Sequence, residues 1–224
     1  MQSTEAASRQ QACNVETGED VVLQACGLSV AHGGQALFAN WSAVFPPGLT
    51  LVRGGDGRGK STLLRLLAGQ LPADAGELQI HGVSLRQAPD AYRAQVFFSE
   101  ARTDAFDALT PLQYFEAQQH RYPAFDKARL DRLVGGLALD EQLGKQLFML
   151  STGSKRKVFL AAAFASGAAL TLLDMPFAAL DKASIHFVMA MLEDTSAATE
   201  RAFVVADYVA PGEIPLAGLI DLGD

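Results

Sequence analysis

Short apolar runs alternate with longer amphipathic stretches along most of the chain. Continuous or alternating apolar runs predict strands, and apolar residues spaced three or four apart predict helices. The expected strands are 21–30, 37–45, 49–52, 78–85, 95–98, 169–173, 202–205 and 219–222. The expected helices are 61–69, 111–120, 126–137, 155–165 and 184–195. Strands that alternate with helices in this way predict an α/β domain with a mostly parallel sheet.

Two parts of the chain depart from this alternation. Only His32, Gly33 and Gly34 separate the first two strands, which predicts an antiparallel β part near the N-terminus. Residues 105–150 are charged and helix-compatible, which predicts a small helical insert. Residues 1–20 are polar and lack the apolar stretch of a signal peptide, so we expect a tail followed by one domain at 21–224.

Composition narrows the class of protein. The 224 residues are 49% hydrophobic, enough for one substantial core, and the net charge of -7 argues against a nucleic-acid partner. The longest uncharged run, 158–173, is too short for a membrane span and is broken by Ser166 and Gly167. We therefore expect a cytoplasmic protein that reaches a membrane only through a partner.

The strongest chemical signal follows the strand at 49–52. Residues 54–61, Gly-Gly-Asp-Gly-Arg-Gly-Lys-Ser, match the P-loop pattern G-x-x-x-x-G-K-[ST] between a strand and a helix. In such a loop backbone N–H groups surround phosphate oxygens, Lys60 reaches the β- and γ-phosphates, and Ser61 binds Mg²⁺. The alternative is a glycine-rich turn beside a lysine, against which the strand–loop–helix context argues. The residues expected to bind ATP here are Gly54, Gly55, Asp56, Gly57, Arg58, Gly59, Lys60, Ser61 and Thr62.

A second strand ends in a carboxylate suited to the same site. The apolar run Leu170–Leu173 leads directly into Asp174. In P-loop enzymes an aspartate at this place reaches the magnesium shell. Any buried strand can end in aspartate, so the assignment depends on the P-loop. Together the two motifs predict ATP and Mg²⁺ as cofactors, with Lys60 and Asp174 in the catalytic machinery.

Residues 150–157, Leu-Ser-Thr-Gly-Ser-Lys-Arg-Lys, lie shortly before that strand. They resemble the L-S-G-G-Q signature of ATP-binding cassette (ABC) proteins, with Thr152 and Ser154 replacing Gly and Gln. Residues 72–77 also resemble the family's P-x-x-G-E turn, and residues 179–181 resemble its D-loop. The alternatives are an ordinary helix N-cap for Ser151 or Thr152 and a turn acid for Asp181.

This resemblance, which runs from about residue 28 to 205, implies a fold and an assembly. The fold is an ABC-type P-loop NTPase: α/β, with a mostly parallel core sheet, an N-terminal antiparallel β part and a small helical insert. The assembly is a homodimer or heterodimer in which Ser151 and Gly153 of one subunit close on the γ-phosphate held by the other.

Two departures from the family concern catalysis. Where ABC ATPases place a glutamate that polarises the attacking water, this chain has Met175, whose thioether cannot accept a proton. Where they place a switch histidine, it has Asp207, which brings negative charge near the γ-phosphate. We therefore expect ATP binding to be retained better than hydrolysis, with Glu100, Asp207 or Asp181 as possible surrogates.

Two further departures concern binding. Glu100 stands at the Q-loop glutamine, where its oxygens can still serve as magnesium ligands. His32 stands where an aromatic residue usually stacks on adenine. The alternative for His32 is a solvated turn histidine before Gly33 and Gly34.

The function we expect is that of an ATP-binding subunit of an ABC transporter, coupled to a separate membrane-spanning subunit from the cytoplasmic face. One alternative is a soluble ABC-type switch that changes shape on binding ATP. Another is a P-loop kinase, which leaves the signature at 150–157 unexplained.

Overall fold

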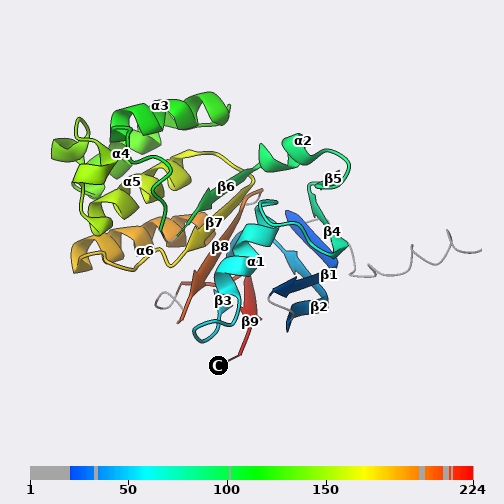
Figure 1. Ribbon diagram of the computed structural model, residues 1–224. Helices are drawn as coiled ribbons and strands as arrows, with labels where there is room; N and C mark the ends of the chain where they lie inside the picture. Colours follow the sequence, from blue (N-terminus) through cyan, green and yellow to red (C-terminus); the bar gives the residue numbers. More distant parts are fainter. Residues whose placement is uncertain are drawn as a thin grey trace, which may run out of the picture.

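A five-stranded parallel sheet forms the centre of the fold (Figure 1). The computed structural model describes residues 21–32, 35–100, 102–196, 200–208, 212 and 214–223, so the predicted tail at 1–20 lies outside the described residues. All the pairings in this sheet are parallel. Its strands, in spatial order, are β6 (Val96–Ser99), β7 (Leu170–Asp174), β8 (Ala202–Asp207), β3 (Gly48–Arg53) and β9 (Gly218–Asp221).

A second, antiparallel sheet lies beside the first. It consists of β2 (Gln35–Phe45), β1 (Leu23–His32), β4 (Ala75–Ile80) and β5 (Val83–Ser84), in that order. The antiparallel pairing of β1 with β2 confirms the expectation from their sequence. The expected strand at 78–85 is divided into β4 and β5 by a turn at His81 and Gly82.

Helices cover both faces of the parallel sheet. The helices are α1 (Lys60–Leu67), α2 (Pro89–Arg93), α3 (Pro111–Arg121), α4 (Lys127–Gly136), α5 (Thr152–Ala165) and α6 (Lys182–Ser196), with short 3-10 turns at Asp140–Gln142 and Leu147–Met149. The sequence did not predict α2, and α5 begins at Thr152 rather than at Lys155. None of the helices in the described ranges is long and apolar enough to span a bilayer.

Alternating residues of the central strands divide the core in two. Leu49 and Leu51 of β3 pack with the helical part formed by α3 to α6. Val52 of the same strand packs with α1 and the antiparallel sheet. This alternation is the ordinary period of a strand, and it places α1 between the two sheets. The helix that follows the P-loop is therefore held on both sides.

Strand register determines where the site forms. Arg53, the last residue of β3, pairs with Asp207, the last residue of β8. Asp174, the last residue of β7, pairs with Ala206. Parallel strands end at one edge of a sheet, so the three segments that follow β3, β7 and β8 start as neighbours.

Candidate functional site

The P-loop connects β3 to α1 through residues 54–59. Gly59 precedes the first helical residue with a φ of 91°, in the left-handed region that a side chain makes unfavourable. No side chain caps α1, so the N–H groups of its first turn have no side-chain acceptor. A helix N-terminus whose N–H groups have no side-chain acceptor is suited to bind a phosphate group.

Lys60 lies inside the loop rather than in solvent. Its side chain is only 8% exposed. The Nζ atom donates hydrogen bonds to the carbonyl oxygens of Gly54, at 2.6 Å, and Gly55, at 2.9 Å. On another side it lies 4.3 Å from the centre of the Tyr208 ring. The lysine predicted to hold the β- and γ-phosphates is thus oriented by the loop itself.

The far end of the chain supports the base of the loop. The N–H of Gly55 donates to the carbonyl of Gly223 at 3.0 Å. At Gly54, an added Cβ would lie 3.1 Å from that same carbonyl oxygen. Asp56 and Arg58, by contrast, are exposed at the tip of the loop.

Asp174 and Asp207 complete the edge of the sheet near Lys60. Both carboxyl groups are buried, Asp174 being 6% exposed and Asp207 8% exposed. Lys60, Asp174 and Arg156 all act electrostatically on Asp207, so the four groups lie together. The structure therefore brings together Lys60, Asp174 and Asp207, as the sequence predicted, and adds Arg156.

Two of the three residues predicted to bind magnesium, Ser61 and Asp174, fit that ion. Ser61 and Thr62 lie half-buried in the first turn of α1, and Asp174 supplies a carboxylate at the neighbouring strand end. Mg²⁺ in phosphate sites needs only one or two protein oxygen ligands, since nucleotide phosphates and water supply the rest. No cluster of three His, Cys, Asp or Glu side chains suited to a metal occurs among the residues described.

Glu100, the third predicted metal ligand, forms a different contact. Its carboxylate accepts a hydrogen bond from Nε of Arg65 at 3.2 Å. Arg65 lies one helical turn beyond Ser61 on α1, so Glu100 is close to the correct helix face. To bind a metal ion, Glu100 would have to give up this ion pair.

Burial raises the pKa of Asp207 above that of an ordinary carboxyl group. Desolvation is the main cause, and the Asp174 carboxylate adds to it. The N–H of Tyr208, which donates to Oδ1 at 2.7 Å, and the cations Lys60 and Arg156 act in the opposite direction. The fold therefore disfavours the ionised form of the carboxyl group that the sequence predicted to face the γ-phosphate.

Asp207→Asn is expected to raise the free energy of unfolding at pH 7 by about 1 kcal/mol, or roughly 2–4 °C in Tm. A carboxyl with a raised pKa takes up its proton more readily in the folded state, so its ionised form destabilises the fold at neutral pH. That cost disappears as the pH falls towards the unfolded pKa of about 3.9. Thermal unfolding of both proteins at pH 7 and pH 4 measures the difference. An asparagine variant less stable than the parent at pH 7 would contradict the assignment.

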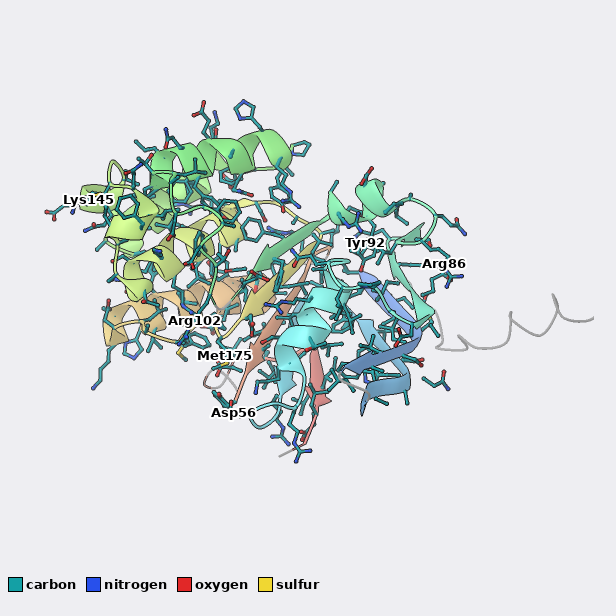
Figure 2. All side chains as sticks on the ribbon, in the orientation of Figure 1. Asp56, Arg86, Tyr92, Arg102, Lys145 and Met175 are labelled. Carbon is teal, nitrogen blue, oxygen red and sulfur yellow. The ribbon has the colours of Figure 1, made fainter. Side chains whose placement is uncertain are left out.

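Met175 stands where the resemblance to ABC proteins predicts a catalytic glutamate. Its backbone is left-handed, with a φ of 51°, and its N–H donates to the carbonyl of Ala206 at 2.9 Å. Its carbonyl accepts a hydrogen bond from Nη1 of Arg156. In the view of Figure 2, Met175 lies between Arg102 and Asp56. The backbone at this position is thus fixed from both sides, while the side chain offers no base.

Arg156 is a residue of this site that the sequence analysis did not assign. It is 8% exposed and lies in the first turns of α5. Burial lowers the pKa of its guanidinium, the carboxylates of Asp174 and Asp207 oppose that shift, and the like charge of Arg102 adds to it. Three consecutive cations at the start of an otherwise apolar helix were the available signal. Because this helix packs on a sheet, at least one of the three consecutive cationic side chains must point towards the sheet.

The signature segment forms the start of α5. Ser151 is the N-cap, and its Oγ accepts from the N–H of Ser154 at 3.1 Å. Gly153 packs so closely on the D-loop that an added Cβ would lie 2.4 Å from the carbonyl oxygen of Ala179. Within the described part of the chain, Ser151 and Gly153 share no hydrogen bond with residues 54–62. Ser151 thus has the capping role considered as an alternative, and its exposure leaves the helix end accessible to another subunit.

The D-loop is tied to the same helix. Asp181 accepts a hydrogen bond from Nζ of Lys157 at 2.8 Å and others from the N–H and hydroxyl of Ser184. The bond from Lys157 and those from Ser184 hold the pKa of Asp181 well below its usual range. Asp181 is therefore ionised at neutral pH and joins α5 to α6.

For His32 only the backbone is described, as the last residue of β1, so its stacking on adenine stays a prediction.

Comparison with known proteins gives the family. The model of the ABC transporter family matches residues 42–178. The cytochrome c biogenesis ATP-binding export protein CcmA of Alkalilimnicola ehrlichii is 37% identical over 164 residues, which cover 71% of this chain and 69% of the relative. The protein of the same name from Dechloromonas aromatica is 33% identical over 177 residues, covering 76% and 85%.

A solved structure shares the fold. The ATP-binding subunit of an ABC transporter superposes with a TM-score of 0.75 at 23% identity, covering 84% of this chain and 80% of its own. At that identity the likeness concerns the fold alone. With the family match over more than half of the sequence, these findings confirm the resemblance found in the motifs. The chain belongs to the ABC transporter family, as one of its ATP-binding subunits.

Proposed function

We propose that this chain binds MgATP between the P-loop and the ends of β7 and β8, and hydrolyses it slowly at its own site. Nucleotide-driven pairing of two ATP-binding subunits then moves a separate membrane-spanning subunit. The observation that carries the proposal is the buried Lys60, which lies with Asp174 and Asp207 beside an uncapped helix N-terminus. Such a site attracts phosphate while holding a carboxylate for magnesium.

Each part of the site has a distinct task. The N–H groups of residues 54–62 hold phosphate oxygens, and Lys60 compensates the charge of the β- and γ-phosphates. Ser61 and Asp174 hold Mg²⁺, with Glu100 as a further oxygen donor once it leaves Arg65. When bound, the ion neutralises charge that develops on the phosphates.

Slow hydrolysis follows from what the site lacks near the γ-phosphate. Met175 cannot orient or deprotonate water, and losing a general base costs roughly 10²- to 10⁴-fold in rate. Asp207 cannot act as the neutral imidazole that the family uses there. A carboxyl with a raised pKa can instead donate one hydrogen bond when it is protonated. We therefore expect tight binding to accompany weak turnover.

Pairing of subunits rests on the exposed end of α5. Its N-terminal turn carries Ser151 at the surface, and the positive end of a helix favours a phosphate of the partner. Because this site is degenerate, a partner that carries a complete catalytic set would form one competent and one impaired site. A homodimer would contain two impaired sites.

Ser151→Asp is expected to abolish ATP-induced dimerisation while ATP binding to the monomer is retained. Aspartate caps a helix as well as serine does, so α5 keeps its N-cap, but the added negative charge repels the partner's γ-phosphate. Ser151→Asn is the matched control, since asparagine also caps and is neutral. Light scattering with and without ATP measures the change in mass. Equal dimerisation by the two variants would contradict the proposed role of the signature.

The names of two relatives support a proposal about the membrane partner and the direction of transport. The two proteins described above are named as export proteins of cytochrome c biogenesis, so we propose an exporter, with this chain on the cytoplasmic face of the membrane. A tagged copy expressed with the membrane protein encoded beside it should sediment with membranes. Removal of that protein should leave the tagged copy in the supernatant. Sedimentation that is independent of the neighbouring protein would count against the assignment.

A further inference from the structure

Asp221 connects the strand before the P-loop to the strand beside it. It is the last residue of β9 and pairs, in the parallel register of the two strands, with Arg53, the last residue of β3 (Figure 1). Nε and Nη2 of Arg53 donate to Oδ2 of Asp221 at 2.9 and 2.6 Å. The other carboxylate oxygen, Oδ1, accepts from the N–H of Gly223 at 2.9 Å. One carboxylate therefore holds both the residue before the loop and the turn after β9.

The turn after β9 holds a peptide unit of the P-loop. The carbonyl of Gly223 accepts from the N–H of Gly55 at 3.0 Å. The carbonyl of Gly54 belongs to the same peptide unit and accepts from Nζ of Lys60 at 2.6 Å. In a planar trans peptide the N–H and the C=O point in opposite directions. The bond to Gly223 on one side of the peptide therefore directs the Gly54 carbonyl towards Lys60 on the other side.

We propose that Asp221 is a positioning residue for ATP binding, which acts through Gly223 and the peptide between Gly54 and Gly55 to orient Lys60. The inference rests on the proposed function, in which Lys60 binds the phosphates. A lysine side chain has many rotamers, and fixing them when a ligand binds costs free energy. Loop carbonyls that already hold Nζ reduce this cost, so whatever fixes those carbonyls favours nucleotide binding.

The contacts of Asp221 affect the loop more than they affect the stability of the fold. The side chains of Arg53 and Asp221 are 50% and 46% exposed, and an ion pair so open to water stabilises a protein only weakly. The hydrogen bonds from Gly223 and Arg53 lower the pKa of Asp221, so the carboxylate is ionised at neutral pH. Replacing Asp221 should therefore leave Tm within about 2 °C of the parent value.

The test measures the affinity for MgATP by isothermal calorimetry. Asp221→Ala removes the acceptor that fixes the turn at Gly223 and is expected to weaken binding by about 3- to 10-fold. Asp221→Asn should lie within about twofold of the parent, because an asparagine side chain can close the same turn onto the N–H two residues further on. Asp90→Ala is the control for loss of an exposed, paired aspartate, since Asp90 pairs with Arg93 on α2, and it should not change the affinity.

The Lys60→Ala background separates positioning of the lysine from general support of the loop. If Asp221 acts through Lys60, Asp221→Ala should change the affinity of the Lys60→Ala protein by less than about twofold. General support of the loop predicts instead the same loss in both backgrounds. This difference between backgrounds is a readout that a merely structural role for Asp221 would not produce.

The outcomes distinguish the positioning role from the site itself. The positioning role is wrong if Asp221→Ala binds MgATP like the parent, if Asp221→Asn is as weak as Asp221→Ala, or if the loss is equal in both backgrounds. The proposed site is wrong if the parent protein does not bind MgATP, or if Lys60→Ala binds it as well as the parent.

Discussion

Lys60→Ala should weaken ATP binding by about 100-fold, because two charge-assisted hydrogen bonds to phosphate are worth roughly 3 kcal/mol together. The effect is large because Lys60 is the cation that the loop buries. Arg58 lies at the exposed tip and has no route to the same position while the helix begins at residue 60. Steady-state hydrolysis should fall at least as far as binding does. Calorimetry with MgATP measures the affinity directly.

Two controls accompany this prediction, one for unrelated loss of a lysine and one for loss of folding. Lys145→Ala removes an exposed lysine at the far side of the helical part (Figure 2), whose Nζ donates to the side chain of Gln142, so ATP binding should not change. Circular dichroism and Tm should confirm that Lys60→Ala remains folded, because the variant leaves the carbonyls of Gly54 and Gly55 without their donor. A folded Lys60→Ala protein that binds ATP within about twofold of the parent would remove the basis of the proposed site.

Local patterns were enough to predict the motifs of the site and most elements of the fold. A P-loop requires a buried strand, glycines and a lysine within a dozen residues, and all of these are visible in sequence between Leu49 and Ser61. Asp174 was visible for the same reason, since a fully buried strand is a continuous apolar run. By contrast, α2 has only five residues and too few turns to show a helical period.

The contacts that the sequence did not reveal depend on register between distant segments. Tyr208 reaches Asp56 because β8 pairs with β3 in one register, and a shift of one residue would direct it to the other face. Glu100, which follows β6, meets Arg65 of α1 across a separation of 35 positions in the sequence. The start of α5 was placed three residues late because its first residues, Thr152 to Ser154, have no apolar period and depend on the cap at Ser151.

Met175→Glu is expected to raise steady-state ATP hydrolysis by about 100-fold, since it restores a carboxylate that can orient and activate water. The backbone of residue 175 is already held by Ala206 and Arg156, so a new side chain starts from a fixed position. The guanidinium of Arg156, which bonds to the carbonyl of residue 175, favours the ionised form of a neighbouring carboxyl. Phosphate release under saturating MgATP measures the gain.

Met175→Gln is the matched control for this gain, because glutamine has the length of glutamate and cannot take a proton. It should leave turnover within a few-fold of the parent, and affinity for ATP should be similar in all three proteins. Combining Met175→Glu with Lys60→Ala should remove the gain, which ties the new activity to the P-loop. Rapid turnover by the parent that Met175→Glu does not increase would mean that another group already activates water. Glu100 and Asp207 would then be the surrogates to test, each by its amide variant.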